Sequence, residues 1–368
     1  MILLQKKFSM KLFDPSFLGH TALKNHIVMA PLTRCRAIGN IPNDLMTLYY
    51  EQRAGAGLII TEGTSPSPNG LGYARMPGIF NEQQVTGWKK ITKGVHKKGG
   101  KIFIQLMHTG RMSHVLNLPE GARVLAPSAI RVTCRQFWTD QQGLQDPCMP
   151  GAMNPEEIAA ARNEYVIAAK NAVDAGFDGT ELHGANCYLL EQFISPVSNQ
   201  RTDDYGGSIQ NRCRFVIEVA EEISRMIGKA KTAIRLSPYG VSGDMKPYPE
   251  LDETYAYLAE KLDEIGIVYI HLVDHSSMGA PEVPVAIKKV IRGKFQNCLI
   301  LSGGYNKDTA ERDLQSGFAD LIAFGKPFIS NPDLVQRLEN NWPLALPDFS
   351  TFYTSDEKGY TDYPRYLV

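Results

Sequence analysis

The chain has 368 residues, a formal net charge of +0, a pI of about 7.1 and a mean hydropathy of -0.22. With 43% hydrophobic residues, this composition predicts a soluble globular protein with a large core. No stretch of roughly 18 apolar residues occurs, and basic residues are spread along the chain, so we expect neither a membrane span nor a nucleic-acid surface.

The N-terminal segment has an apolar tip followed by lysines, which is the reverse of the order in a secretory signal. The sequence therefore predicts no targeting segment and a cytoplasmic protein, with Met10 as a second candidate start. Residues 1–26 precede the first predicted strand, and we expect them to form a small cap under the fold. The six cysteines include no CxxC pair, which favours free thiols over a disulfide framework or a metal site.

Eight short apolar runs recur along the chain, and helical patterns lie between them. The runs lack strict polar alternation, which is typical of strands buried on both faces of a parallel sheet. They span 27–32, 57–63, 101–107, 179–184, 231–238, 269–274, 298–304 and 319–326.

The clearest helix begins at Asn154, where Pro155 suits the first helical position and Glu157 completes a capping box, and it ends at Gly176. Another helix ends at Gly228. Eight units of strand then helix predict an α/β fold, a (β/α)8 TIM barrel. The alternative, an open doubly wound sheet, is disfavoured because no GxGxxG follows the first strand.

We expect one domain spanning residues 1–368, with a long Pro- and Gly-rich insertion, 108–153, after the third strand. Loops that follow strands build the functional face of such a barrel, so this insertion is expected to form part of the site. Polar residues at the same strand ends are the candidate functional residues: Thr33, Gly63, Gln105, His183 and Arg235.

Two loops after the last two strands favour a phosphate site. Gly303 and Gly304 allow close approach of the backbone, and Gly325 precedes Lys326, which can neutralise charge. We expect a helix after them, with Asn331 as its cap. The alternative is that these glycines only form tight turns.

Arg235 lies in an apolar run and needs an acceptor, which is either an internal carboxylate such as Glu181 or an anionic cofactor ring. Gln105 is either a buried structural residue or a contact to the mixed polar edge of a heterocycle. A phosphate seat, an Arg, a Gln and a Thr around one barrel mouth together predict a flavin mononucleotide (FMN) site.

These residues lie in motifs that resemble the old yellow enzyme family of FMN-dependent ene-reductases over nearly the whole chain. The matching stretches are MAPLTRCRA, GYARMPGIF, FIQLMHTGR, ELHGANCYLLEQFISPVSNQRTDDYGGSIQNRCRF, AIRLSP, LSGGY, FGKPFISNPDLVQRL and GYTDYP. The resemblance implies a TIM barrel with FMN bound noncovalently, and NAD(P)H as a diffusible reductant that acts by a ping-pong mechanism. No metal is implied, and the chain is expected to be a monomer or a homodimer.

The family's residue roles carry over onto matching positions. His183 and Asn186 are implied to bind the activating oxygen of the substrate, and Tyr188 to donate a proton. Tyr73 and Met107 are implied to line the substrate pocket beside them. The implied FMN contacts are Pro31, Thr33, Gly63, Gln105, Arg235, Gly303, Gly304, Gly325 and Lys326.

The implied activity is reduction of the C=C bond of α,β-unsaturated carbonyl or nitro compounds, with nitrate esters and nitroaromatics as further candidate substrates. The alternatives are a non-catalytic flavin-binding barrel and a larger flavin dehydrogenase with an iron–sulfur cluster, for which clustered cysteines are lacking. Three positions depart from the family: Cys187 replaces a Gly, Lys326 an Arg and Met107 a Trp. Thr33 places the chain in the Thr-containing branch.

Overall fold

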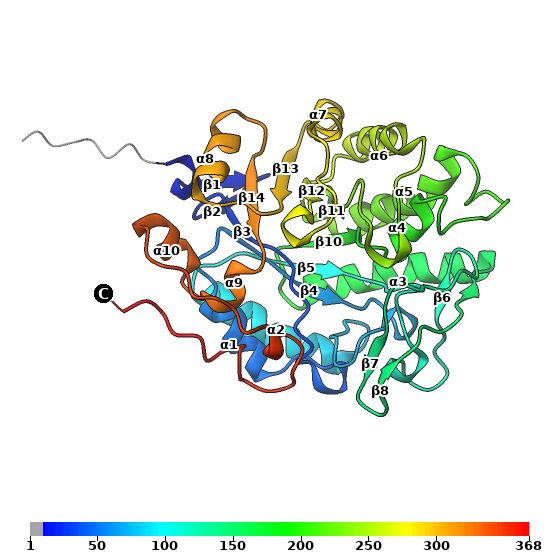
Figure 1. Ribbon diagram of the computed structural model, residues 1–368, viewed down its shortest axis with the longest axis horizontal. Coiled ribbons are helices and arrows are strands. Elements are labelled where there is room, and N and C mark those ends of the chain that lie inside the picture. Colours follow the sequence, from blue (N-terminus) through cyan, green and yellow to red (C-terminus); the bar gives the residue numbers. More distant parts are fainter. Residues whose placement is uncertain (1–9, 368) are drawn as a thin grey trace, which may run out of the picture.

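The computed structural model describes residues 10–367, which form a closed parallel barrel with helices around it (Figure 1). Each of the eight predicted strands is present, and β14 pairs with β3 to close the ring. The open doubly wound sheet is therefore wrong. The barrel strands are β3 (Ile27–Met29), β4 (Leu58–Thr64), β5 (Ile102–Leu106), β10 (Gly179–Gly184), β11 (Thr232–Leu236), β12 (Tyr269–Val273), β13 (Cys298–Ser302) and β14 (Leu321–Phe324).

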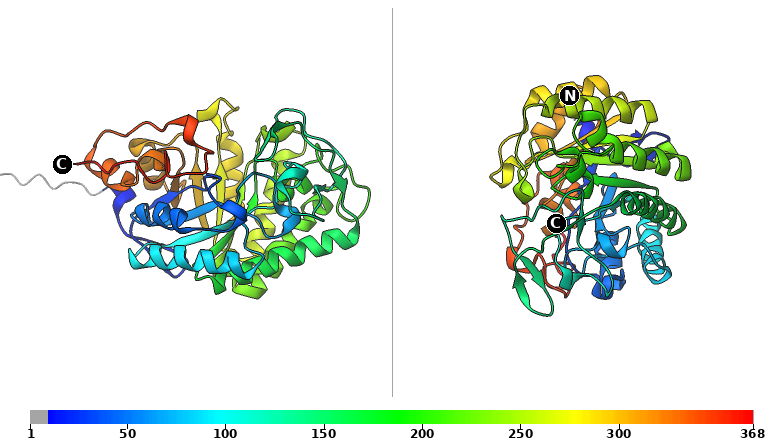
Figure 2. Two further views of the ribbon diagram at one scale, coloured as in Figure 1. Left: turned by 90° about the horizontal axis from the view of Figure 1, so that it is seen from below. Right: turned by 90° about the vertical axis from the view of Figure 1, so that its right-hand side faces the viewer.

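One outer helix follows each barrel strand on the outside of the ring (Figure 2). These helices are α1 (Asp44–Gln52), α2 (Glu82–Lys97), α3 (Pro155–Asp174), α5 (Ile209–Ile227), α6 (Leu251–Ile265), α7 (Val285–Lys294), α8 (Lys307–Gln315) and α10 (Leu334–Asn340). Two short helices, α4 (Leu189–Ile194) and α9 (Pro327–Ser330), directly follow the strand ends of β10 and β14. No helix in residues 10–367 is both long and apolar enough to span a bilayer.

The predicted capping box of α3 is confirmed. The side chain of Asn154 accepts from the N–H of Glu157 at 2.8 Å, and the Glu157 carboxylate accepts from the N–H of Asn154 at 2.9 Å. Gly176, with φ +88°, takes the chain out of the helix, and Gly228 does the same after α5 with φ +93°. The capping box and the two glycines determine where α3 begins and where α3 and α5 end, and therefore where the next strands enter the barrel.

The barrel interior is filled by side chains at its lower end, and the N-terminal hairpin closes it. The hairpin consists of β1 (Ser16–Leu18) and β2 (Thr21–Leu23). Its two buried leucines join one apolar cluster with interior residues: Leu18, Leu23, Val28, Ile60, Phe103, Ala233 and Ile300. The predicted cap is therefore present within residues 10–26. Residues 1–9, where the absence of a targeting signal was predicted, lie outside the described residues.

Two segments cover the opposite end, the barrel mouth. The insertion after β5 contributes the pair β6 (Leu125–Ala126) and β9 (Gly151–Ala152) and the hairpin β7 (Phe137–Thr139) and β8 (Gly143–Gln145). The second segment is the C-terminal segment, residues 349–361, which lies on the same side as this hairpin (Figure 2).

Buried arginines just after β3 hold the C-terminal segment in place. Arg34 donates to the carbonyl oxygen of Gly359 at 2.7 Å, and Arg36 donates to that of Phe352 at 2.7 Å. The first barrel strand and the end of the chain therefore build one wall of the mouth.

Candidate functional site

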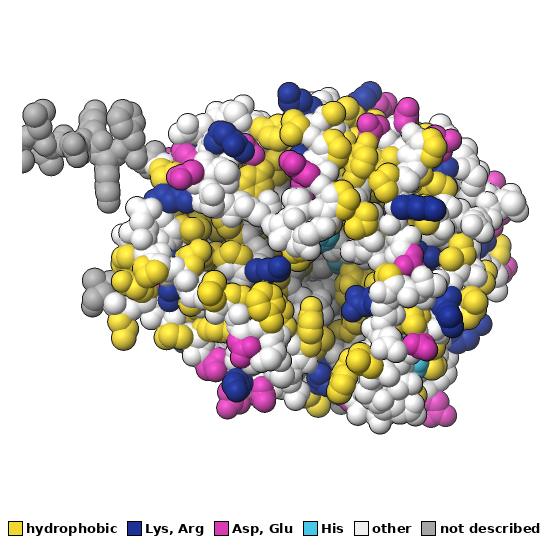
Figure 3. Space-filling view, in the orientation of Figure 1, with side chains coloured by type: hydrophobic (Ala, Val, Ile, Leu, Met, Phe, Trp, Pro, Cys, Tyr) yellow, Lys and Arg dark blue, Asp and Glu magenta, His cyan; other side chains and the backbone are white. Residues whose placement is uncertain are grey.

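A cavity of about 500 Å³ opens at the carboxyl ends of the barrel strands. The face of the molecule that carries it is hollowed near its centre (Figure 3). Predicted residues at the carboxyl ends of five barrel strands meet in its lining: Pro31, Thr33, Asn186, Tyr188, Arg235, Gly303, Gly304, Gly325 and Lys326. Residues Phe352 and Tyr353 of the C-terminal segment close its rim, and sequence analysis missed both.

The loops after β13 and β14 contribute Gly303, Gly304, Gly325 and Lys326 to the cavity lining. Gly303 has φ +126°, and a Cβ there would lie 2.5 Å from the carbonyl oxygen of Asp274, so only glycine fits. Gly325 and Lys326 lead into the N-terminus of α9. The prediction for Asn331 is wrong: it follows the last residue of α9, its side chain donates to the carbonyl oxygen of Pro327, the first residue of α9, and α10 begins later, at Leu334.

Arg235 and His183 are cross-strand neighbours on β11 and β10. Both are buried, and neither Arg235 Nε nor His183 Nδ1 has a hydrogen-bond partner within residues 10–367. No carboxylate in this range forms an ion pair with Arg235, so the internal ion pair is wrong. Burial, followed by the charge of Arg235, holds the pKa of His183 well below its usual value, so His183 is neutral at pH 7.

A buried polar network inside the barrel connects Gln105 to residues of other barrel strands. Glu181 accepts from Gln105 Nε2 at 2.7 Å and from the Tyr269 hydroxyl at 3.0 Å, and it lies 2.9 Å from His271 Nδ1. The second ring nitrogen of His271 lies 3.2 Å from Ser302 Oγ. Gln105 is thus partly structural, although its Oε1 receives no donor within the described range. His271, in the apolar run 269–274, was the overlooked signal for this network.

The turn after β10 presents Asn186 and Tyr188. Asn186 and Cys187 both have left-handed backbones, with φ +59° and +63°. Asn186 N–H donates to Ser237 Oγ at 3.0 Å, and Asn186 Oδ1 lies 2.7 Å from His275 Nε2. Because an amide oxygen can only accept, His275 donates, and the Asn186 NH₂ group remains a donor toward the cavity.

Tyr188 joins this cavity to a second hollow of about 640 Å³ beneath the insertion hairpin and the C-terminal segment. Thr33 lines both hollows, whereas Tyr73 lines only the second. The Tyr188 ring packs edge-on against His183 with centroids 4.7 Å apart. Sequence analysis missed Arg135, which lies over the Tyr73 ring and lines the same hollow.

Four predicted residues are buried and are not among the residues that line the two hollows: Gly63, Gln105, His183 and Met107. Met107 packs in one apolar cluster with Tyr73 and Tyr188. Gly63 is directly against it, since a Cβ at Gly63 would lie 2.5 Å from the Met107 sulfur. Gly63 and Met107 therefore set the position of the tyrosines.

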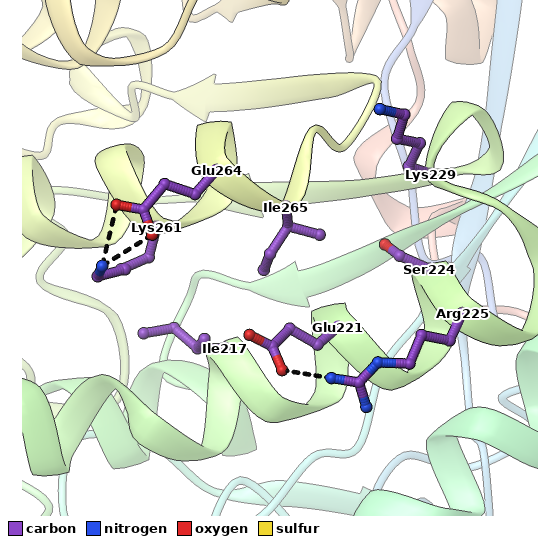
Figure 4. A pocket seen from close by; sticks show the side chains of 8 residues that line it. All are labelled: Ile217, Glu221, Ser224, Arg225, Lys229, Lys261, Glu264 and Ile265. Atoms are coloured by element: carbon purple, nitrogen blue, oxygen red, sulfur yellow. Dashed lines mark hydrogen bonds and ion pairs between the residues drawn. The ribbon is translucent and has the colours of Figure 1, made fainter.

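A third hollow, of about 480 Å³, lies on the outer surface between α5 and α6 (Figure 4). Four of its five charged residues form two ion pairs, Arg225 with Glu221 and Lys261 with Glu264, and the fifth is Lys229. It contains none of the predicted residues. Within the described range, no group of three His, Cys, Asp or Glu side chains is placed to hold a metal ion.

Residues 11–345 match the sequence model of the NADH:flavin oxidoreductase / NADH oxidase family. A probable flavin mononucleotide-dependent alkene reductase of Leishmania infantum is 39% identical over 357 residues, which cover 96% of this chain and 97% of that protein. A structure of morphinone reductase in complex with tetrahydroNAD is 40% identical, covers 98% of both chains and gives a TM-score of 0.92. An old yellow enzyme homologue from Zymomonas mobilis is 40% identical with a TM-score of 0.90, covering 96% of this chain and 99% of that chain.

Proposed function

Because this chain belongs to the NADH:flavin oxidoreductase / NADH oxidase family, the old yellow enzyme family expected from its motifs, we propose that it reduces activated C=C bonds with NAD(P)H. Membership makes it an FMN-dependent oxidoreductase. The substrates would be α,β-unsaturated carbonyl or nitro compounds. The observation that carries this proposal is the convergence of Asn186, Tyr188 and the unpaired Arg235 on one cavity.

The residues of this cavity fit FMN. The phosphate would lie against Gly303, Gly304 and the loop of Gly325 and Lys326, where backbone and charge favour an anion. Arg235 has a buried N–H without a partner, which suits an acceptor on the ring. When bound, FMN supplies the hydride that NAD(P)H provides.

His183 and Asn186 would bind the activating oxygen of the substrate. Negative charge grows on that oxygen as the alkene is reduced, so fixed donors lower the barrier. His183 is neutral at pH 7, so one ring nitrogen carries a hydrogen and the donor is an uncharged imidazole. His275 orients the Asn186 amide so that its NH₂ is available.

Tyr188 would deliver the proton from its hydroxyl to the substrate α-carbon. Burial raises the pKa of Tyr188 well above 10, so the phenol keeps its proton at neutral pH. Its hydroxyl lies 3.1 Å from that of Tyr73 in the second hollow, through which the substrate would enter.

NAD(P)H would visit the same cavity and leave before the alkene binds, because the sequence has no separate dinucleotide fingerprint. The morphinone reductase structure that holds tetrahydroNAD supports this use of one site. NADH or NADPH is the proposed reductant in a single-domain chain that is a monomer or a homodimer. The six unpaired cysteines fit a reducing compartment, which supports a cytoplasmic location.

The function is tested by separating the two half-reactions of the yellow holoenzyme by stopped flow. NADPH should bleach the flavin, and an enone should restore its colour. His183→Ala should slow the enone step roughly 10²-fold or more. A protein that binds FMN but is not bleached by NADH or NADPH would instead be a non-catalytic flavin-binding barrel.

Tyr188→Phe should leave flavin reduction nearly intact and slow enone reduction, with a smaller loss for nitroalkenes, because a nitronate is stable enough to leave before protonation. If both half-reactions slow equally, Tyr188 is not the proton donor.

A further inference from the structure

A buried glutamate lies directly behind the turn that carries Asn186 and Tyr188. Glu191, on α4, is 4% exposed and belongs to none of the roles above. Its Oε2 accepts from the backbone N–H of Cys187 at 2.5 Å. Its Oε1 accepts from the hydroxyl of Ser237 and, at 3.3 Å, from that of Tyr255. Three donors from three elements thus converge on one carboxylate.

The turn needs such a partner because its backbone is strained. Asn186 and Cys187 are consecutive non-glycine residues in the left-handed region, which L-residues adopt rarely. Cys187 also has a Cβ that glycine would lack. A conformation of this kind persists only when its surroundings hold it in place.

The carboxylate reaches both strained residues. It bonds to Cys187 N–H directly, and it reaches Asn186 through Ser237, whose Oγ accepts from Asn186 N–H at 3.0 Å and donates to Glu191. Asn186 and Tyr188 flank Cys187 in the chain. Any rotation of the two peptide units therefore redirects the amide of Asn186 and the phenol of Tyr188 together.

We propose that Glu191 is a positioning residue for alkene reduction, which through Cys187 N–H and Ser237 Oγ fixes the directions of the Asn186 amide and the Tyr188 hydroxyl. The assignment rests on the proposed function of Asn186 and Tyr188. Glu191 itself contacts neither substrate nor cofactor and acts through the turn.

Several groups face this carboxylate and set its charge. Burial raises the pKa of Glu191 to about 7, and the donors from Ser237, Cys187 and Tyr255, with the charge of Arg111, oppose that rise. The Tyr248 phenol also lies close enough to interact with it. A protonated carboxyl would bring a fourth hydrogen to a site already filled by three donors, so the turn is held best above pH 7.

The test replaces the carboxylate with an amide in the holoenzyme. Glu191→Gln should lower kcat for an enone roughly 10- to 100-fold and raise KM, because small misplacements of catalytic groups cost that much. Binding of the saturated ketone product, measured by titration of the flavin absorbance, should weaken as well. FMN content should match the wild type, and the wild-type decline of the enone step below pH 7 should disappear.

Two control variants separate positioning from general stability. Glu311→Gln alters another buried glutamate, which accepts from the N–H groups of Lys11 and Leu12 at 2.9 Å at the opposite end of the barrel. Tyr255→Phe removes a donor to Glu191 that has no link to Asn186. Because the Tyr255 hydroxyl helps to keep the Glu191 carboxylate ionised, the comparison is made well above pH 7, where both variants should keep kcat, KM and ketone affinity within about twofold of the wild type.

Ser237→Ala cuts the path to Asn186 and leaves the carboxylate in place, so it remains informative if Glu191→Gln fails to fold. Ser237→Ala should weaken ketone binding. The double variant of Ser237→Ala and Glu191→Gln should lose little more ketone affinity than Glu191→Gln alone. The assignment would be overturned if Glu191→Gln or Ser237→Ala bound the ketone as tightly as the wild type does. It would also be overturned if the loss of ketone affinity in the double variant equalled the product of the two single losses. A wild-type enzyme that binds the ketone but reduces no enone would instead refute the proposed function.

Discussion

The phenolic oxygens of Tyr188 and Tyr73 lie 3.1 Å apart, and no other hydrogen-bond partner of the Tyr188 hydroxyl exists among residues 10–367. Tyr73 therefore sets the rotation of the group proposed to donate the proton. Tyr73→Phe removes this hydrogen bond and keeps the ring, which should slow single-turnover enone reduction roughly fivefold, the effect of one neutral hydrogen bond. Flavin reduction by NADPH is the internal control. If Tyr73→Phe slowed enone reduction as much as Tyr188→Phe does, Tyr73 would do more than orient the Tyr188 hydroxyl.

Arg235→Ala should weaken FMN binding and lower the reduction potential of the bound flavin. The buried guanidinium has no ion pair within the described range, so its charge is available to the flavin, which gains negative charge on reduction. The fluorescence of FMN released when the protein is diluted measures FMN affinity. Reduction in the presence of a reference dye of known potential measures the reduction potential of the bound flavin. Arg235→Lys keeps the charge and should recover part of the potential. Unchanged values in Arg235→Ala would remove Arg235 from the flavin contacts.

Glu62→Gln should change how stability depends on pH. Burial of Glu62 raises its pKa from 4.5 to about 7, despite its bonds to Arg34 N–H and the Tyr50 hydroxyl. The folded chain therefore holds this proton more tightly than the unfolded chain. The stability that the proton contributes is complete below about pH 4.5 and is lost as pH rises to 7.

Relative to Glu62→Gln, the wild-type free energy of unfolding should fall by about 3 kcal/mol over that range, at roughly 1.4 kcal/mol per pH unit. Urea unfolding of both proteins at pH 4.5 and pH 8 measures the difference. A difference that stays constant or grows with pH would show that Glu62 is ionised throughout in the folded state.

Gly243→Ala should destabilise the protein and displace the turn after β10 that carries Asn186 and Tyr188. A Cβ at Gly243 would lie 2.6 Å from Cys187 Sγ, which donates to the Gly243 carbonyl at 3.2 Å, and the backbone has φ +62°. Gly39→Ala is the matched control, since its φ is +64° and no atom lies within 4 Å of the new Cβ.

Both variants carry the left-handed strain of about 1–2 kcal/mol, and only Gly243→Ala adds a clash of about 1–3 kcal/mol. Thermal unfolding and enone kinetics compare them. Equal melting temperatures would mean that the loop at Gly243 moves aside without cost.

The barrel could be predicted from the sequence because its strands are uninterrupted apolar runs and its helices carry their own caps, as at Asn154. The cavity residues at strand ends could be predicted for the same reason. His275 could not, because it meets Asn186 across a separation of 89 residues that no local pattern reveals. Asn331 was wrongly expected to start a helix because its side chain instead bonds Pro327 and Ala345 oxygens.

The guanidinium groups that bind the C-terminal segment also have a consequence for the order in which the molecule is made. Arg36 is synthesised before seven of the eight barrel strands, yet it donates to carbonyl oxygens of Thr351, Phe352 and Lys358. Until residues 349–361 exist, Arg36 lacks these acceptors, since of its bonds only that to the Arg34 carbonyl lies close in the chain, and the flavin cavity lacks its rim. We therefore expect holoenzyme assembly to be a late event in translation, and an mRNA truncated after β14 to yield a barrel whose cavity is open where Phe352 and Tyr353 would close it.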